Sequence, residues 1–514
     1  MRALAGYSWL KETYDLPVIN LWQECAIDTA NKGRKKQDLG THKIEVFEAS
    51  YQPEDTLTAQ IQFALRYEGL NLQVLSMLFS KTGHQEIAGW VLKSPTSVYA
   101  RRACFLYEWL TDEEIPIESP VPSKARYVDA LDVDIQFGLT AINRTTKFRV
   151  NDNLPGTHRF CPLIRRTAFL NEIRHKDLKK QTKLTLDRYD KDLLQRTAAF
   201  LYFKETQSSF ELEREKPSPD RAQRFADLLR QADTSRPLTE ERLAELQNAV
   251  VDPRFHEFGW RAQQNWLGDD LGYRQKVDFV PPRPEDVPDL MQGLLDTAAK
   301  ARTNNQVDDD NPIRESSLDP LMFAATIAFG FVFIHPFMDG NGRIHRYLIH
   351  EVLANAGFTP QGIVLPVSAV ILANLDRYVA VLENFSKPIR EKTTFSPAQP
   401  DAVATGNDAV YFSYFDATEQ TEFLCWALLQ TIEKDLQEEI EFLIGFGRAQ
   451  KSLNELLDWP RNSLSLFIRV VHQNEDQLSK AKKESHFEWM TEEEIAMAEA
   501  SVKAAFGFCR IQKS

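Results

Sequence analysis

The chain has 514 residues, of which 43% are hydrophobic, 11% aromatic and 26% charged, as in ordinary folded globular proteins. Its 61 basic and 74 acidic residues give a formal net charge of −13. This negative charge argues against a protein that binds duplex nucleic acid through phosphate contacts, so we expect no nucleic-acid partner. The five cysteines lack Cys-x-x-Cys spacing, which argues against a zinc site or disulfide framework and favours a cytoplasmic location. The length predicts about three domains.

Neither the N-terminal segment nor the most apolar segment has membrane character. Residues 1–12 carry charges where a signal peptide needs an uninterrupted apolar stretch. The most apolar run, 321–334, holds 14 residues, whereas a transmembrane helix needs about 20. We therefore expect a soluble protein without a membrane partner, in which this run forms a buried helix.

The first half of the chain shows helical periodicity. Apolar positions at helical spacing predict helices over 56–114, and a Pro-rich connector follows at 115–126. Residues 176–213 have the pattern of one or two charged helices, which are stopped by Pro217.

The residue pattern changes at 259–284, where aromatic and turn residues alternate. This pattern predicts a β-hairpin at about 264–280, followed by a helix over 285–301. A linker rich in Pro, Thr, Ala and Asp is predicted over 388–408, and apolar spacing beyond it predicts a helical C-terminal region.

A glycine-rich loop follows the apolar run directly. Residues 335–346 are His-Pro-Phe-Met-Asp-Gly-Asn-Gly-Arg-Ile-His-Arg. Gly340 and Gly342 flank Asn341, so the backbone can approach a ligand closely. Apolar periodicity resumes at Ile344, which predicts a helix that begins close to Gly342. Glycines that lead into a helix N-terminus form an anion site from backbone N–H groups and the helix dipole.

The charged side chains of this loop suit a polyphosphate. Arg343 and Arg346 lie three residues apart, hence on one helical face, and both can reach phosphates. Asp339 offers the hard carboxylate ligand that suits Mg²⁺ bridging phosphates. His335 can accept a proton near neutral pH. Each feature alone is more often a cap, a plain turn or a solvated face, but together they favour a nucleotide site.

The loop also resembles a known signature. Residues 335–346 resemble the Fic-domain motif, His-x-Phe-x-Asp/Glu-Gly-Asn-Gly-Arg-x-x-Arg, at every specified position. The resemblance covers a Fic domain at 195–390, with flanking regions at 1–190 and 400–514. It implies a mainly α fold, in which a Fic-type helical core with one β-hairpin flap lies between helical N- and C-terminal regions.

The resemblance implies a protein adenylyltransferase. Such an enzyme transfers AMP from ATP to a Ser, Thr or Tyr hydroxyl of a protein, including the chain itself, and pyrophosphate leaves. His335 would be the general base, and Asp339 would hold Mg²⁺. The flap would pair with an extended segment of the target by strand addition. The residues implied in nucleotide binding are Asp339, Gly340, Asn341, Gly342, Arg343, Arg346 and Tyr378.

A regulatory motif is implied upstream. Ser209 and Glu213 match the inhibitory motif Ser/Thr-x-x-x-Glu-Gly/Asn of autoinhibited Fic proteins, and they lie one helical turn apart. In such proteins the glutamate pairs with the second arginine of the loop motif, here Arg346, and keeps the γ-phosphate out. The chain departs from the motif at Arg214, where Gly or Asn is usual. The alternative interpretation of this segment is a solvated, charged helix end.

Two other functions are compatible with the same sequence. One is a hydrolase that removes AMP from proteins at the same site. The other is a non-catalytic interaction scaffold with a vestigial site. The presence of His335, Arg343 and Arg346 together disfavours the scaffold.

Overall fold

The structure is a computed structural model that describes residues 2–39, 42–139, 143–189, 191–232, 236–270, 275–305, 318–360, 362–397, 403–460 and 463–511. These residues are mostly helical, which confirms the predicted mainly α class. Within these residues, no helix combines the length and the apolar character that crossing a membrane requires.

The N-terminal region combines a small sheet with helices. The strand order is β1-β2-β4-β3, with a parallel pair between β2 and β4. Its first elements are β1 (Arg2–Ala5), α1 (Tyr7–Thr13), β2 (Gln23–Asp28), β3 (Lys35–Asp38) and β4 (Lys43–Phe47). The predicted helices over 56–114 follow as α2 (Leu57–Tyr67), α3 (Leu72–Thr82), α4 (Gln85–Lys93) and α5 (Val98–Thr111).

A second small sheet and two helices complete this region. They are β5 (Val128–Asp129), β6 (Asn143–Thr145), β7 (Val150–Asp152), α6 (Ala168–Lys176) and α7 (Leu178–Leu186). Residues 1–190, expected to be mostly helical, therefore also contain strands β1 to β7. Two of these strands show no apolar alternation in the sequence, because β3 consists of exposed polar residues and β2 begins with the buried polar residue Gln23.

The central part of the chain is a helical core with one hairpin. Its elements are α8 (Lys191–Leu212), α9 (Pro219–Arg230), α10 (Glu240–Val250), β8 (Leu267–Asp270), β9 (Gln275–Phe279), α11 (Val287–Asn305), α12 (Pro320–Ile334), α13 (Asn341–Asn355), α14 (Val367–Ala373) and α15 (Leu375–Lys392). The antiparallel pair β8–β9 confirms the predicted hairpin, whose turn at 271–274 lies outside the described residues.

Helix α12 lies at the centre of this core. It is apolar on all sides, and 13 of its 15 residues are buried. A helix without a polar face must be covered on every side, and α11, α13 and α17 (Thr418–Gln430) pack against it. This packing fixes the C-terminal end of α12, from which the glycine-rich loop departs.

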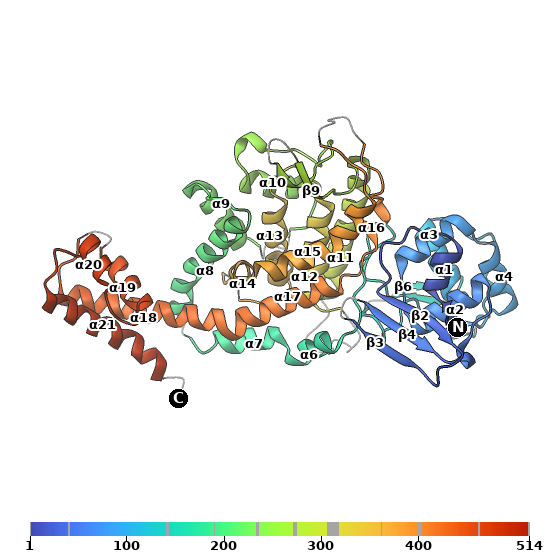
Figure 1. Ribbon diagram of the computed structural model, residues 1–514, viewed down its shortest axis with the longest axis horizontal. Coiled ribbons are helices and arrows are strands. Elements are labelled where there is room, and N and C mark those ends of the chain that lie inside the picture. The colour runs from blue at the N-terminus through green and yellow to red at the C-terminus, as the bar shows by residue number, and fades with distance from the viewer. Residues whose placement is uncertain are drawn as a thin grey trace.

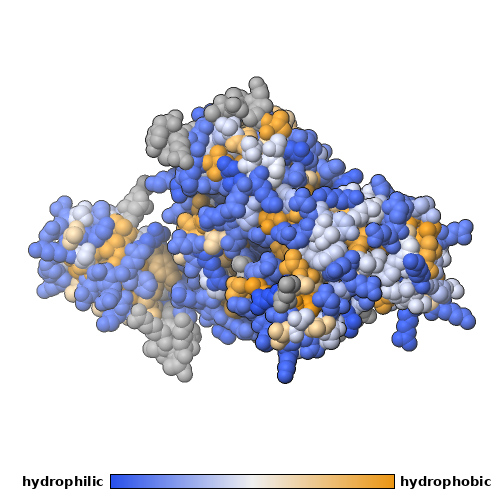
Figure 2. All heavy atoms as spheres, turned by 45° about the vertical axis from the view of Figure 1, so that its right-hand side comes forward, coloured by the Kyte–Doolittle hydropathy of each residue, from blue (hydrophilic) through white to orange (hydrophobic). Residues whose placement is uncertain are grey.

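A long helix connects the core to a separate C-terminal cluster. Helix α17 continues through a π-helical turn (Thr431–Asp435) into α18 (Leu436–Leu456), which leaves the core (Figure 1). There α19 (Ser463–Gln473), α20 (Lys480–His486) and α21 (Glu492–Ile511) pack with it around a hydrophobic core of their own. The N-terminal region lies at the opposite end of the molecule (Figure 1). Polar side chains cover most of the face in Figure 2, and apolar patches on it are scattered.

The predicted linker is shorter than expected. Helix α15 extends to Lys392, so the first residues of the predicted range 388–408 are helical. Backbone hydrogen bonds then join Thr394 to Thr405, and α16 (Ala409–Ser413) follows. Residues 398–402 lie outside the described part of the chain.

Candidate active site

The glycine-rich loop is a tight connection between two buried helices. Helix α12 ends at Ile334 and is followed by the C-cap residue His335, whose backbone is left-handed with φ 53°; the His335 N–H donates to the Phe331 carbonyl at 2.9 Å. Helix α13 begins at Asn341, directly after Gly340 with φ 89°. The predicted start near Gly342 is therefore correct within one residue. The first N–H groups of a helix lack intrahelical partners, so they line the end of α13 beside the loop.

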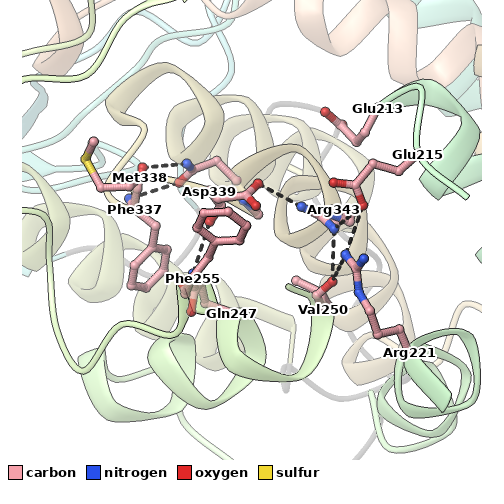
Figure 3. A network of polar contacts seen from close by, with 12 residues as sticks. Glu213, Glu215, Arg221, Gln247, Val250, Phe255, Phe337, Met338, Asp339 and Arg343 are labelled. Atoms are coloured by element: carbon pink, nitrogen blue, oxygen red, sulfur yellow. Dashed lines mark hydrogen bonds and ion pairs between the residues drawn. The ribbon is translucent and has the colours of Figure 1, made fainter. Parts of the chain in front are cut away.

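Side chains from neighbouring segments hold the loop in place. The Asn341 amide spans it, since Oδ1 accepts from the Phe337 N–H at 3.1 Å and Nδ2 donates to the Phe337 carbonyl at 2.7 Å. Glu257 accepts from the Met338 N–H at 2.8 Å. Gln247 of α10 donates to the Asp339 carbonyl at 3.3 Å, and Figure 3 shows it beside the loop. The loop is therefore preorganised before any ligand binds.

His335 is a neutral imidazole at the start of this loop. Its Nδ1 lies 3.1 Å from the Val332 carbonyl, so Nδ1 carries the hydrogen and Nε2 is the atom that can accept a proton. Burial lowers the pKa of His335 to about 4, and the nearby charge of Arg261 acts in the same direction. The side chain therefore stays uncharged near neutral pH, as a general base requires.

Asp339 fits the role of a Mg²⁺ ligand. Its Oδ1 accepts from Arg343 Nη2 at 2.8 Å and from the Gly340 N–H. Within the described residues Oδ2 has no such bond, and the carboxylate is partly exposed, so Oδ2 can take a metal ligand position. Magnesium is commonly held by one or two carboxylates together with substrate phosphates, and no group of three or more metal-ligating side chains occurs among the described residues.

Arg346 is buried, and its guanidinium binds Ser209 of α8 and Glu213 just beyond the end of that helix. Its Nε donates to Ser209 Oγ at 2.8 Å, and Nη2 donates to the Ser209 carbonyl and to Glu213 Oε1, both at 2.7 Å. Burial alone would raise the pKa of Glu213, but the charge and the hydrogen bond of Arg346, together with the charge of Arg343, outweigh burial and hold that pKa below its usual value. The contact predicted between Glu213 and Arg346 is present.

The contacts that the α8 segment makes with α13 recur every four residues along both segments. Glu205 pairs with His350 at 2.7 Å, Ser209 contacts Arg346, and Glu213 reaches Gly342. A Cβ atom at position 342 would lie 2.0 Å from Glu213 Oε1. Only glycine therefore fits there while Glu213 is in place.

The backbone conformation of Arg214 shows how the end of α8 accommodates this departure from the inhibitory motif. The Arg214 N–H donates to Glu211 O at 2.9 Å and the Glu215 N–H to Phe210 O at 3.1 Å, which together form a Schellman C-cap. The Arg214 backbone is left-handed, with φ 57°, a conformation that Gly and Asn adopt most easily. Arginine thus takes the conformation that the usual residue would take, and Glu213 keeps its place.

We expect Arg214→Gly to stabilise the protein. Glycine adopts the left-handed conformation without the cost of about 1 kcal/mol that a side chain adds, so the free energy of unfolding should rise by about that amount. Chemical denaturation followed by circular dichroism measures it. Glu211→Gly, inside the last turn of α8, is the matched control and should destabilise by a similar amount. A lower unfolding midpoint for Arg214→Gly would contradict the cap assignment.

Tyr378, the remaining residue implied in nucleotide binding, lies beside His345 of α13. Tyr378 of α15 is only 6% exposed, and its ring centroid is 6.2 Å from that of His345. Burial raises its pKa to about 12, while the charge of Arg346 opposes that rise. Tyr378 is thus placed to support Arg346, and its contact with a nucleotide stays a prediction.

Comparison with known proteins finds a family match in the central part of the chain. Residues 237–353 match the Fic/DOC family, so the chain contains a Fic/DOC domain, and this range includes α10, the hairpin, α12 and most of α13. Ser209 and Glu213, which the sequence predicts to be inhibitory, lie outside the matched range.

Two relatives carry the name protein adenylyltransferase Fic. The protein from Nematostella vectensis is 40% identical over 83 residues, which is 16% of this chain and 17% of that protein. The protein from Drosophila willistoni is 40% identical over 81 residues, which is 16% of this chain and 14% of that protein. This chain spans less than a fifth of the length of these curated relatives.

Two solved structures are more distantly similar. A Fic domain containing signaling protein from Bacteroides thetaiotaomicron is 21% identical with a TM-score of 0.34, over 50% of this chain and 95% of that one. A Fic family protein from Desulfovibrio desulfuricans is 18% identical with a TM-score of 0.38, over 66% of this chain and 86% of that one.

Proposed function

We propose that this chain is a protein adenylyltransferase that uses ATP and Mg²⁺. The observation that carries the proposal is the placement of a neutral His335 beside a helix N-terminus that also presents Asp339, Arg343 and Arg346. The relatives named protein adenylyltransferase Fic support it, since they match this chain at about 40% identity over the Fic domain.

The chemistry follows from the positions of these groups. His335 Nε2 takes the proton from a Ser, Thr or Tyr hydroxyl while the hydroxyl oxygen attacks the α-phosphorus of ATP. The bond from the α-phosphorus to the bridging oxygen breaks, and pyrophosphate leaves. The N-terminal N–H groups of α13, with Gly340 and Gly342, cradle the phosphates. Arg343 holds the β-phosphate and Arg346 the γ-phosphate.

Asp339 would hold the metal. When bound, Mg²⁺ neutralises charge on the phosphate oxygens and on the leaving pyrophosphate. The target, which includes the chain itself, would add as an extended strand to the β8–β9 hairpin.

Glu213 is proposed as an inhibitor of this site. While its carboxylate pairs with Arg346 at 2.7 Å, that guanidinium is not available to a γ-phosphate. The Glu213 carboxylate also fills the space beside Gly342, where it leaves no room even for a Cβ atom, so no phosphate could enter that space while Glu213 is in place.

Mass spectrometry of labelled protein tests the reaction. Full-length protein with ATP and Mg²⁺ should show an added AMP group on itself or on a lysate protein, and EDTA should stop the addition because Asp339 then lacks its cation. Addition of phosphate alone, or labelling that is insensitive to EDTA, would contradict the proposal.

A further inference from the structure

A second carboxylate at the end of α8 binds the other arginine of the loop. Glu215 Oε2 lies 2.9 Å from Arg343 Nη1 and also 2.9 Å from Nη2 of Arg221, in α9 (Figure 3). Glu215 is outside both sequence motifs. Arg343, 1% exposed, is thereby held by Glu215 on one side and by Asp339 on the other.

Arg221 and Arg343 form a prepared pair of cations. The Val250 carbonyl accepts from both guanidinium groups at 2.9 Å, and both guanidinium carbons lie 5.3 Å from the Phe210 ring. The Nε atoms of both arginines are buried, and within the described part of the chain neither has a hydrogen-bond partner. Two fixed arginines with unused donors, bridged by one carboxylate, have the character of an anion site.

The charges around the loop balance only while α8 is in place. Arg221, Arg343 and Arg346 face the carboxylates of Asp339, Glu213 and Glu215. Displacement of the two glutamates leaves three cations and one carboxylate, an excess that suits the polyphosphate of a nucleotide bound with Mg²⁺.

We propose that Glu215 occupies a second anion subsite, built by Arg343 and Arg221, which takes the terminal phosphates of the nucleotide. Arg221 is then a nucleotide-binding residue outside the loop motif, and Glu215 blocks it as Glu213 blocks Arg346. This inference rests on the proposed function, because it takes ATP as the ligand. Both glutamates belong to the same C-cap of α8, and Arg221 is on α9, which packs against α8 as well as against α10 and α13.

Nucleotide titrations of the full-length protein test the subsite. Glu215→Gln removes the charge but keeps the shape, so it should raise affinity for ATP and for ADP about tenfold, the scale of one charged hydrogen bond. AMP, which lacks the terminal phosphates, should bind the variant and the wild type equally. Adding Arg221→Gln to the Glu215→Gln protein should reverse the gain.

Arg224→Gln is the matched control, because Arg224 lies one turn further along α9 and pairs with Asp220 at the surface. It should leave the ATP affinity of the Glu215→Gln protein unchanged, and Arg221→Lys, which keeps a cation, should retain part of the gain. Thermal unfolding shows whether each variant is folded. If Glu213→Gly binds ATP but Glu215→Gln binds no better than wild type, the second subsite is wrong and the proposed function stands. If none of the variants binds ATP, both are wrong.

Discussion

Replacing His335 with alanine should lower AMP transfer by about 10²- to 10⁴-fold, the usual contribution of a general base. In the proposed mechanism His335 Nε2 accepts the proton, and its removal should leave the α13 N-terminus and both arginines in place. ATP binding, measured by titration, should therefore persist. Self-labelling with radioactive ATP at fixed protein concentration gives the rate.

A second histidine provides the control for this result. His256 lies in the loop that also supplies Glu257 to the Met338 N–H. His256→Ala should transfer AMP at nearly the wild-type rate. Equal loss in both variants would mean that the loop geometry, rather than His335, had been disturbed.

The pH profile gives an independent check on His335. A general base works in its unprotonated form, so activity is lost as the pH falls through its pKa. Because burial lowers that pKa to about 4, transfer should stay constant on the acid side between about pH 5 and pH 7. A decline centred near 6.5, the ordinary histidine value, would place the base in a solvated environment instead.

Replacing Glu213 with glycine should raise self-labelling by more than about fivefold at fixed ATP. Fivefold is what the loss of an exposed ion pair, worth about 1 kcal/mol, would produce. The expected gain is larger because Arg346 is 1% exposed and its release restores a γ-phosphate ligand. The initial rate of AMP incorporation measures the gain.

Arg346→Ala in the Glu213→Gly protein should abolish the gain, since the released partner is then missing. Glu211→Gly places a glycine in the same helical turn without touching Arg346, so it should label like the wild type. If Glu211→Gly and Glu213→Gly label equally fast, loosening of α8 would explain the effect, and Glu213 would have no specific inhibitory role.

The sequence predicted the parts of the site that depend on local spacing. The continuous apolar run located α12, and the glycine pair followed by apolar periodicity located the start of α13. The pairing of Glu213 with Arg346 was predicted from a family resemblance, and the structure contains that contact.

Glu215 could not be predicted in the same way. On a continuing helix, residue 215 would not share the face of residues 209 and 213. The left-handed turn at Arg214 redirects the chain and brings Glu215 to Arg343 instead. A positive φ at a non-glycine residue gives no signal in apolar periodicity. Strands β2 and β3 of the N-terminal sheet were missed for a different reason, since neither shows an apolar alternation in its sequence.

The contacts of the α8 segment with α13 lie within one chain, which determines how the proposed inhibition responds to the amount of protein. Glu213 belongs to the same chain as the site that we propose it blocks, and even short flexible tethers give effective concentrations of about millimolar. The Glu205–His350 contact fixes α8 more firmly than such a tether would. Dilution therefore leaves the fraction of blocked sites unchanged. A cell that makes twice as much of this protein would have twice as many unblocked sites, with the same fraction of molecules unblocked.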